Sequence, residues 1–149
     1  MMKRAIAASA IAISAIAGYE GLSLVAYKDP VGIPTICYGY TKDVFMGMTK
    51  TVQECQYLLE SEVEKFSKGV LDLYSGPITQ GELDAYTSLA YNIGLDAFSR
   101  STLLKKLKSG DRKGACNELR RWVYAGGKVL RGLEARRKAE ERMCLSGLN

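Results

Sequence analysis

Two capping boxes set the helical framework of this 149-residue chain. In a capping box, a Ser or Thr and the Glu three residues later each satisfy a free backbone N–H at the start of a helix. Thr51 with Glu54 and Thr79 with Glu82 form this pattern, and each pair precedes apolar residues at helical spacing. The sequence therefore predicts a long helix that connects two lobes, followed by a second helix that ends at Gly94.

The rest of the chain predicts a small sheet and further helices. The Asp-Pro-Val-Gly sequence at residues 29–32 is a turn signal between two short stretches that favour strands, which indicates a hairpin or a three-stranded sheet. Helices are expected over residues 101–108, 111–122 and 133–145, and the glycines at 126–127 stop the second of these. A small sheet lobe beside a larger helical lobe is an α+β fold.

Composition excludes several kinds of chemistry. The chain has no histidine, which excludes Ser-His-Asp and Cys-His catalysis and every metal site that uses histidine. Catalysis must then use carboxylates, hydroxyls or thiols, and neither a metal nor a cofactor is expected. The net charge of +5 suits nucleic acid, an anionic membrane or an anionic polymer such as a bacterial wall, and by itself selects none of them.

The redox state expected of the four cysteines depends on the compartment. No two of them form a C-x-x-C pair, so zinc ligation is not expected; they are Cys37, Cys55, Cys116 and Cys144. In an exported chain they predict two disulfides, with three possible connectivities. In a cytosolic chain they would be four buried thiols.

The N-terminal segment indicates export. Lys3 and Arg4 precede an uncharged Ala- and Ile-rich run, residues 5–18, and the next charge is Glu20. About fourteen such residues match a secretory apolar region and fall short of the roughly 20 that span a bilayer. The Ala-Ile-Ala sequence at 15–17 matches a cleavage site. A removable signal peptide, an uncleaved export segment and an ordinary buried helix all remain open.

Two carboxylates lie where helix surfaces do not require them. Glu20 follows the apolar segment, Asp29 lies in the turn, and Thr35 lies on the returning strand. Glycoside hydrolysis uses one carboxyl group, in apolar surroundings, to protonate the leaving oxygen. A second, ionised carboxylate activates water or stabilises the positive centre. Alone, Asp29 could be only a turn former and Thr35 only a strand residue.

The spacing Glu20-x8-Asp29-x5-Thr35 resembles the catalytic triad of phage-type lysozymes, glycoside hydrolase family 24. The likeness covers about residues 18–149. Further segments resemble the family's helical lobe in the same order: residues 89–94, 98–103, 121–127 and 132–140.

The resemblance implies a lysozyme-like α+β fold and a role for each matching residue. Glu20 would be the general acid, Asp29 the general base or an electrostatic partner, and Thr35 would hydrogen-bond the attacking water. Tyr91 and Ser101 match positions that touch substrate in relatives. The bond cleaved would be the β-1,4 link from N-acetylmuramic acid to N-acetylglucosamine, in a catalytic domain over residues 19–149.

One departure from the family bears on the cysteines. Relatives commonly have Gly-x-Gly-His after the Thr strand, whereas residues 37–40 here are Cys-Tyr-Gly-Tyr. Without the histidine, the sheet lobe lacks a frequent ion pair, and a Cys37–Cys55 disulfide could replace it. The accompanying hypothesis is a Cys116–Cys144 disulfide between the last two helices.

Residues 1–18 resemble the signal-anchor-release segment of some phage endolysins, which are exported uncleaved, held at the membrane and then released. This resemblance predicts an enzyme tethered to the host inner membrane through residues 5–18, then periplasmic, with peptidoglycan as substrate. We expect a monomer that does not bind nucleic acid. The rival functions are a non-enzymatic wall-binding or inhibitory module and a membrane-lytic protein. The wall-binding module has no use for Glu20 and Asp29 at this spacing. An Ala-Ser-rich helix without a basic face is poorly suited to membrane lysis.

Overall fold

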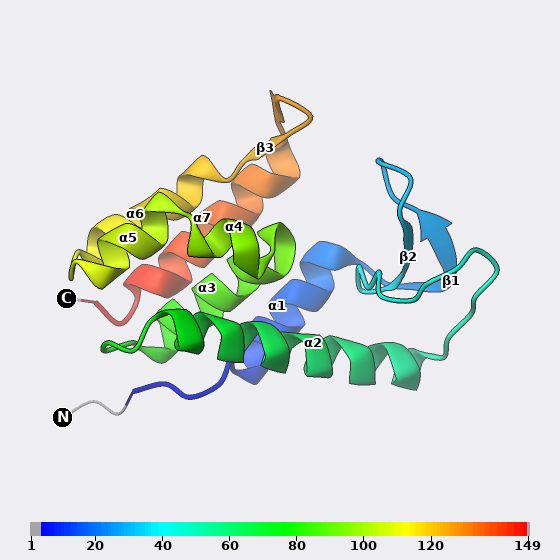
Figure 1. The fold of residues 1–149 in the computed structure, drawn as a ribbon, viewed down its shortest axis with the longest axis horizontal. Coiled ribbons are helices and arrows are strands. Elements are labelled where there is room, and N and C mark those ends of the chain that lie inside the picture. The colour runs from blue at the N-terminus through cyan, green and yellow to red at the C-terminus, as the bar shows by residue number, and fades with distance from the viewer. Residues whose placement is uncertain (1–3, 149) are drawn as a thin grey trace.

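One long helix joins a small sheet lobe to a helical lobe in the computed structural model, which describes residues 4–148 (Figure 1). The helices are α1 Ala10–Glu20, α2 Val52–Leu73, α3 Gln80–Ile93, α4 Leu95–Ser99, α5 Thr102–Lys108, α6 Arg112–Glu118 and α7 Arg131–Leu145, with a 3-10 turn, η1 Leu119–Arg121. The strands are β1 Ser23–Lys28, β2 Pro34–Cys37, β3 Tyr124–Ala125 and β4 Lys128–Val129. Helix α2 runs from the β1–β2 sheet to the helical lobe (Figure 1).

Both capping boxes form as the sequence predicts. The Thr51 hydroxyl accepts a hydrogen bond from the Glu54 N–H at 3.1 Å, and the Glu54 carboxylate accepts one from the Thr51 N–H at 2.9 Å. Thr79 and Glu82 make the same reciprocal pair at 3.1 and 2.8 Å. Helix α3 is buried over residues 82–90 and packs against α1, α2 and α7. It therefore forms the centre of the helical-lobe core.

The sheet lobe is a hairpin. Strands β1 and β2 are antiparallel, with Tyr27 opposite Thr35 and an irregular register between Ser23 and Tyr27. Of the two predicted arrangements, the structure has the hairpin; in place of a third strand there is an isolated bridge between Val25 and Thr49. The predicted turn at residues 29–32 connects the two strands.

The second half of the helical lobe departs from the prediction in three places. The helix expected over 111–122 ends as α6 at Glu118 and continues only as the short turn η1. Gly126 and Gly127, with φ of 59° and 78°, form the turn of the β3–β4 hairpin and do not directly end a helix. Helix α4 was not predicted because its five residues are too short for a periodic signal.

The two predicted disulfides are present. Cys37 bonds to Cys55, which ties β2 to α2, and Cys116 bonds to Cys144, which ties α6 to α7. We call the second one the helical-lobe disulfide. Because the bonds join residues 18 and 28 positions apart, each is worth about 3 kcal/mol on a chain-entropy argument. The alternative of four free thiols is wrong for this structure.

The N-terminal segment lies on the helical lobe in this structure. Residues 4–9 have no helix or strand and lead into α1, whose Ala12 and Ile16 side chains are fully buried against α2 and α3. A boundary at residues 18 and 19 falls inside α1. In residues 4–148, no helix has both the length and the apolar character needed to cross a membrane. Lys3, which the sequence prediction used as a charge, lies outside the described residues.

Candidate active site

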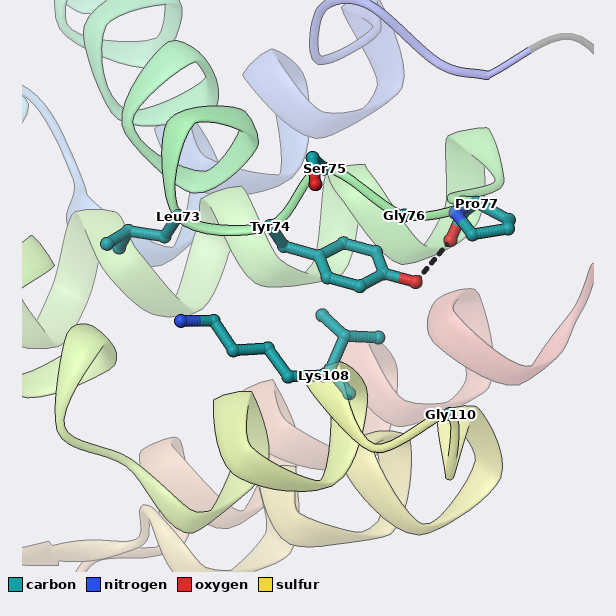
Figure 2. A pocket seen from close by; sticks show the side chains of 8 residues that line it. Leu73, Tyr74, Ser75, Gly76, Pro77, Lys108 and Gly110 are labelled. Carbon is teal, nitrogen blue, oxygen red and sulfur yellow. Dashed lines mark hydrogen bonds between the residues drawn. The ribbon is translucent and has the colours of Figure 1, made fainter.

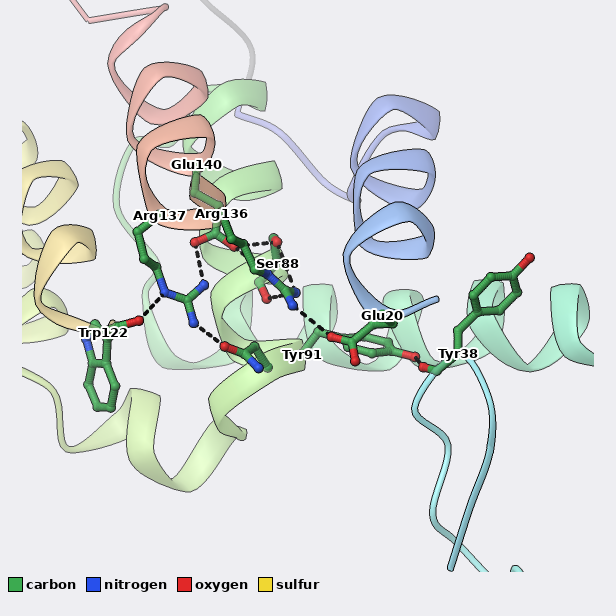
Figure 3. Close-up of polar contacts among 9 residues, drawn as sticks. Glu20, Tyr38, Ser88, Tyr91, Trp122, Arg136, Arg137 and Glu140 are labelled. Carbon is green, nitrogen blue, oxygen red and sulfur yellow. Dashed lines mark hydrogen bonds and ion pairs between the residues drawn. The ribbon is translucent and has the colours of Figure 1, made fainter. Parts of the chain in front are cut away.

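Glu20 is the last residue of α1, at the junction of the two lobes (Figure 3). Gly21 follows with φ of 73°, a left-handed conformation that glycine adopts without strain, and this turns the chain into β1. The Glu20 side chain is 18% exposed. Solvent can therefore reach the carboxylate although protein surrounds most of it.

Arg136 of α7 binds the Glu20 carboxylate. Its Nη1 lies 2.8 Å from Glu20 Oε2, and its guanidinium lies 4.8 Å from the ring centroid of Tyr19. The same guanidinium donates from Nε to Glu140 Oε2 at 3.2 Å and from Nη2 to the Ser88 carbonyl oxygen at 3.0 Å. Three further contacts therefore hold Arg136 in place, so that its position beside Glu20 is fixed.

A buried ion-pair network extends from Arg136 on the side away from Glu20 (Figure 3). Glu140 is fully buried and also accepts from Arg137 at 2.7 Å and from the Ser88 hydroxyl at 2.5 Å. Arg137 donates to the Trp122 carbonyl oxygen at 2.7 Å and to Asn92. Burial lowers the pKa of Arg137, and the charge of Glu140 opposes that shift. A buried carboxylate with two guanidinium partners is a compensated arrangement that loses much of its stability when one partner is removed.

The sheet lobe reaches the other side of Glu20 through Gly39. A Cβ atom placed on Gly39 would lie 2.8 Å from Glu20 Oε1, and φ at this glycine is 76°. Both the space and the backbone conformation require glycine here. Glu20 is thus enclosed between Arg136 of the helical lobe and the backbone after β2.

Asp29 organises the hairpin turn. Its Oδ1 accepts from the Val31 N–H at 2.9 Å and from the Ile33 N–H at 2.8 Å. Within residues 4–148, its other carboxylate oxygen has no hydrogen bond from the protein. Asp29 is therefore a turn former, as the simpler interpretation expects, and it also keeps one oxygen for another partner.

Thr35 and Tyr91 each have a defined partner. Thr35 is buried and donates from its hydroxyl to the Ile33 carbonyl oxygen at 2.9 Å, which leaves its lone pairs able to accept. Tyr91, on α3, donates to the Tyr38 carbonyl oxygen at 2.6 Å, and its ring lies 5.4 Å from that of Phe66. Burial and the nearby Glu20 charge raise the pKa of Tyr91. Tyr91 therefore links α3 to the segment after β2.

Ser101 has a structural role as the N-cap of α5. Its hydroxyl accepts from the Leu104 N–H at 3.1 Å and donates to the Phe98 carbonyl oxygen at 2.7 Å, and the residue is buried. Substrate contact by Ser101 stays a prediction.

Sequence reasoning assigned no role to Arg136, Glu140, Tyr19 or Gly39. In the sequence, the segment 132–140 is distinguished only by its resemblance to the family. Arg136 lies 116 residues after Glu20, and no local spacing indicates a contact over that distance. For Gly39, the sequence offers one signal: Tyr40 stands where relatives commonly have a histidine, which marks the segment after β2 as unusual.

The structure has hollows both at and away from Glu20. One of about 500 Å³ lies between the end of α2 and α5, beside Tyr74 and Lys108 (Figure 2), and no predicted catalytic residue lines it. Another, of about 170 Å³, is lined by Gly39 and Tyr91. Among the described residues, no group of three acidic or cysteine side chains is placed to hold a metal ion.

A sheet lobe and a helical lobe that hold a carboxylate between them are the arrangement expected of a lysozyme-like glycosidase, and the comparisons with known proteins agree. The sequence profile of the family described as Phage lysozyme matches residues 17–140. A SAR-endolysin of Enterobacteria phage P21 is 42% identical over 152 residues, which cover 96% of this chain and 92% of that relative.

Solved structures agree with this assignment. An endolysin from Escherichia coli O157:H7 phage FAHEc1 has a TM-score of 0.84 at 35% identity, over 99% of this chain and 98% of that one. The active form of P1 phage endolysin Lyz has a TM-score of 0.85 at 26% identity, over 97% and 88% of the two chains. The chain belongs to the phage lysozyme family. The predicted α+β fold and the predicted class, a peptidoglycan-cleaving glycoside hydrolase, are confirmed.

Proposed function

We propose that Glu20 protonates the glycosidic oxygen when this enzyme cleaves the β-1,4 bond between N-acetylmuramic acid and N-acetylglucosamine. The observation that carries the proposal is the 2.8 Å contact between Glu20 and the immobilised Arg136. Glu20 does not have the apolar surroundings expected of the acid, because Arg136 is its neighbour. The fixed guanidinium instead acts on the product of proton transfer: it stabilises the carboxylate that Glu20 becomes, without reorganising. Asp29 uses its free oxygen to activate water or to stabilise the oxocarbenium-like centre, and Thr35 accepts a hydrogen bond from the attacking water.

Replacement of the proposed acid tests this assignment. Glu20→Gln keeps the shape of the side chain and removes its titratable proton, so we expect peptidoglycan hydrolysis to fall by at least the roughly 10²- to 10⁴-fold typical of general acid catalysis. Glu64→Gln, at an exposed position of α2, is the matched control and should hydrolyse at the normal rate. Near-normal turnover by Glu20→Gln would remove Glu20 from the mechanism and reopen the two non-enzymatic interpretations.

We further propose that residues 1–18 tether the enzyme to the inner membrane after export and that α1 docks only after release into the periplasm. Glu20 directly follows the uncharged segment. While residues 5–18 lie in the bilayer, Glu20 stays at the membrane surface and cannot reach both Arg136 and Gly39. Tethering would therefore keep the enzyme inactive.

Contacts of residues 4–9 support docking as a specific event. Asp84 accepts from both the backbone N–H and the hydroxyl of Ser9, at 2.8 and 2.5 Å. Ser67 accepts from the Ala8 N–H at 2.9 Å, and Gln80 donates to the Ala7 carbonyl oxygen at 2.8 Å. Asp84 and Ser67 are buried, and without the segment they would lose these hydrogen bonds from Ser9 and Ala8.

The membrane potential supplies the restraint in this proposal. Lys3, Arg4 and the terminal amine must cross the bilayer outward for the segment to leave. Each charge costs about 2.3 kcal/mol per 100 mV, so the three are restrained by roughly 7 kcal/mol. Depolarisation removes that cost. Fractionation of expressing cells before and after an uncoupler tests the proposal: the chain should move from membrane to periplasm with residues 1–18 intact. A chain already soluble in energised cells, or one whose N-terminus begins near residue 18, contradicts it.

We also propose that the released enzyme is a monomer that does not bind nucleic acid. Four of the eight basic residues from Arg120 onward are buried or paired within the fold. Arg136 and Arg137 are buried, Arg120 pairs with Glu141 at 2.7 Å, and Arg121 pairs with Glu118 at 3.0 Å. A monomeric mass in solution and no retardation of duplex DNA at physiological salt are the expected results.

A further inference from the structure

The smaller hollow, which Gly39 and Tyr91 line, has charged side chains and lies next to the proposed acid. Its volume is about 170 Å³, and its walls come from the segment after β2, from α2 and from α3. Gly39 is part of the wall, and a Cβ placed on it would lie 2.8 Å from Glu20 Oε1, although Glu20 itself does not line the hollow. A group bound in this hollow would therefore lie close to Glu20.

Three charged side chains line the hollow. Lys42 comes from the segment after β2, and Lys65 and Glu62 come from α2. Within the part of the chain that the structure describes, none of them takes part in an ion pair, whereas Arg136 and Arg112 are paired. The lining thus has two lysines, one from each of two segments, and one carboxylate, so the hollow carries a net charge of about +1 at neutral pH.

The remaining wall is aromatic. Phe66 and Tyr91 lie with ring centroids 5.4 Å apart, and the Lys65 ammonium lies 5.8 Å from the Phe66 centroid. The Tyr91 hydroxyl is already used on the Tyr38 carbonyl oxygen. The Tyr91 ring can thus pack against aliphatic or sugar C–H groups, while the two lysines remain available to an anion.

We propose that this hollow is a carboxylate-binding subsite for the peptide stem of the glycan strand. The inference rests on the proposed peptidoglycan hydrolysis and adds a specificity to it. Lys42 and Lys65 bind one stem carboxylate, and Glu62 accepts from a neighbouring amide N–H of the stem. The aromatic wall packs against the aliphatic part of the stem residue. The net charge of +1 matches a single carboxylate.

Amidation of the wall carboxylates tests the subsite. Purified sacculi are compared with sacculi whose carboxyl groups have been converted to amides with carbodiimide and ammonia, with release of reducing ends as the measurement. We expect wild type to show a KM roughly tenfold lower on native than on amidated sacculi, from loss of charged hydrogen bonds, at similar kcat. The double variant Lys42→Gln/Lys65→Gln should lose that preference by weakening only on native sacculi.

A control of equal net charge separates the subsite from general attraction. Lys68→Gln/Lys105→Gln removes two exposed lysines that do not line this hollow, and it should keep the tenfold preference. The subsite is refuted if wild type has no preference, or if the double variant at residues 42 and 65 keeps it, or if the control loses it equally. Failure of the proposed function itself gives a different result, in which wild type releases no reducing ends from either substrate.

Discussion

Asp84→Asn should loosen the docked N-terminal helix without changing the catalytic residues. Asp84 stands at the N-terminus of α1, where its carboxylate accepts two hydrogen bonds from Ser9 and one from Gln80 at 2.9 Å. Asparagine has nearly the same shape but offers one acceptor oxygen and no charge. The Ser9 hydroxyl would face an amide group and would have to rotate to accept from it.

The size of the effect follows from two losses. Hydrogen bonds to a charged group exceed neutral ones by about 1 kcal/mol, and a negative charge at a helix N-terminus contributes roughly 0.3–1 kcal/mol, or more when partly buried. Together they predict a cost of about 2 kcal/mol. Docking of α1 would then weaken by about 30-fold.

Hydrogen exchange of α1 measures this cost directly. In Asp84→Asn, amides of α1 should exchange about 30-fold faster, and activity should fall only as far as the undocked population rises. Asp72→Asn, at an exposed carboxylate of α2, is the control and should leave α1 protection unchanged. Unchanged α1 protection in Asp84→Asn would refute the claim that this carboxylate holds the segment.

Three further substitutions test the active-site geometry and the stability of the helical lobe. Gly39→Ala places a Cβ 2.8 Å from Glu20 Oε1, so the rate of hydrolysis should fall. Gly47→Ala is the control: it is strained at φ of 96°, but its Cβ contacts nothing and the variant should remain active. Equal activities of the two variants would contradict the proposed enclosure of Glu20. Glu140→Gln should lower the free energy of unfolding, measured by urea denaturation, by about 3–5 kcal/mol, whereas the more exposed Glu141→Gln should lower it by less than about 1 kcal/mol. A small loss in Glu140→Gln would show that the network is not a compensated buried ion pair. Replacing both cysteines of the helical-lobe disulfide with serine should cost about 3 kcal/mol, and an unchanged thermal midpoint would contradict that value.

Local signals in the sequence predict the parts of the fold that local interactions determine. The boxes at Thr51 and Thr79 satisfy their own helix ends, so both helix starts could be predicted. The same reasoning failed where tertiary contacts determine the local structure. Gly126 and Gly127 are compatible with a helix stop or with a hairpin turn, and only pairing of the flanking strands selects the hairpin.

The N-terminal segment and the ion-pair network could not be predicted for a different reason. An Ala-Ile run buries apolar surface equally well in a bilayer or against α2 and α3, so composition leaves both states open. The groups that select the docked state, such as Asp84, lie about 75 residues away from their partner Ser9. Glu20 was found through its spacing to Asp29, but its partner Arg136 depends on the folded packing of α1 against the rest of the helical lobe.

The central claim is hydrolysis of the muramic acid linkage with Glu20 as the acid, and identification of the newly exposed sugar tests it most directly. Purified sacculi are digested, reduced with borohydride and hydrolysed, and the sugar alcohols are identified by mass spectrometry. Wild type should yield N-acetylmuramic acid as its alcohol, and Glu20→Gln should yield almost none. Reducing ends at N-acetylglucosamine, anhydro products without a reducing end, or equal yields from the two proteins would contradict the account.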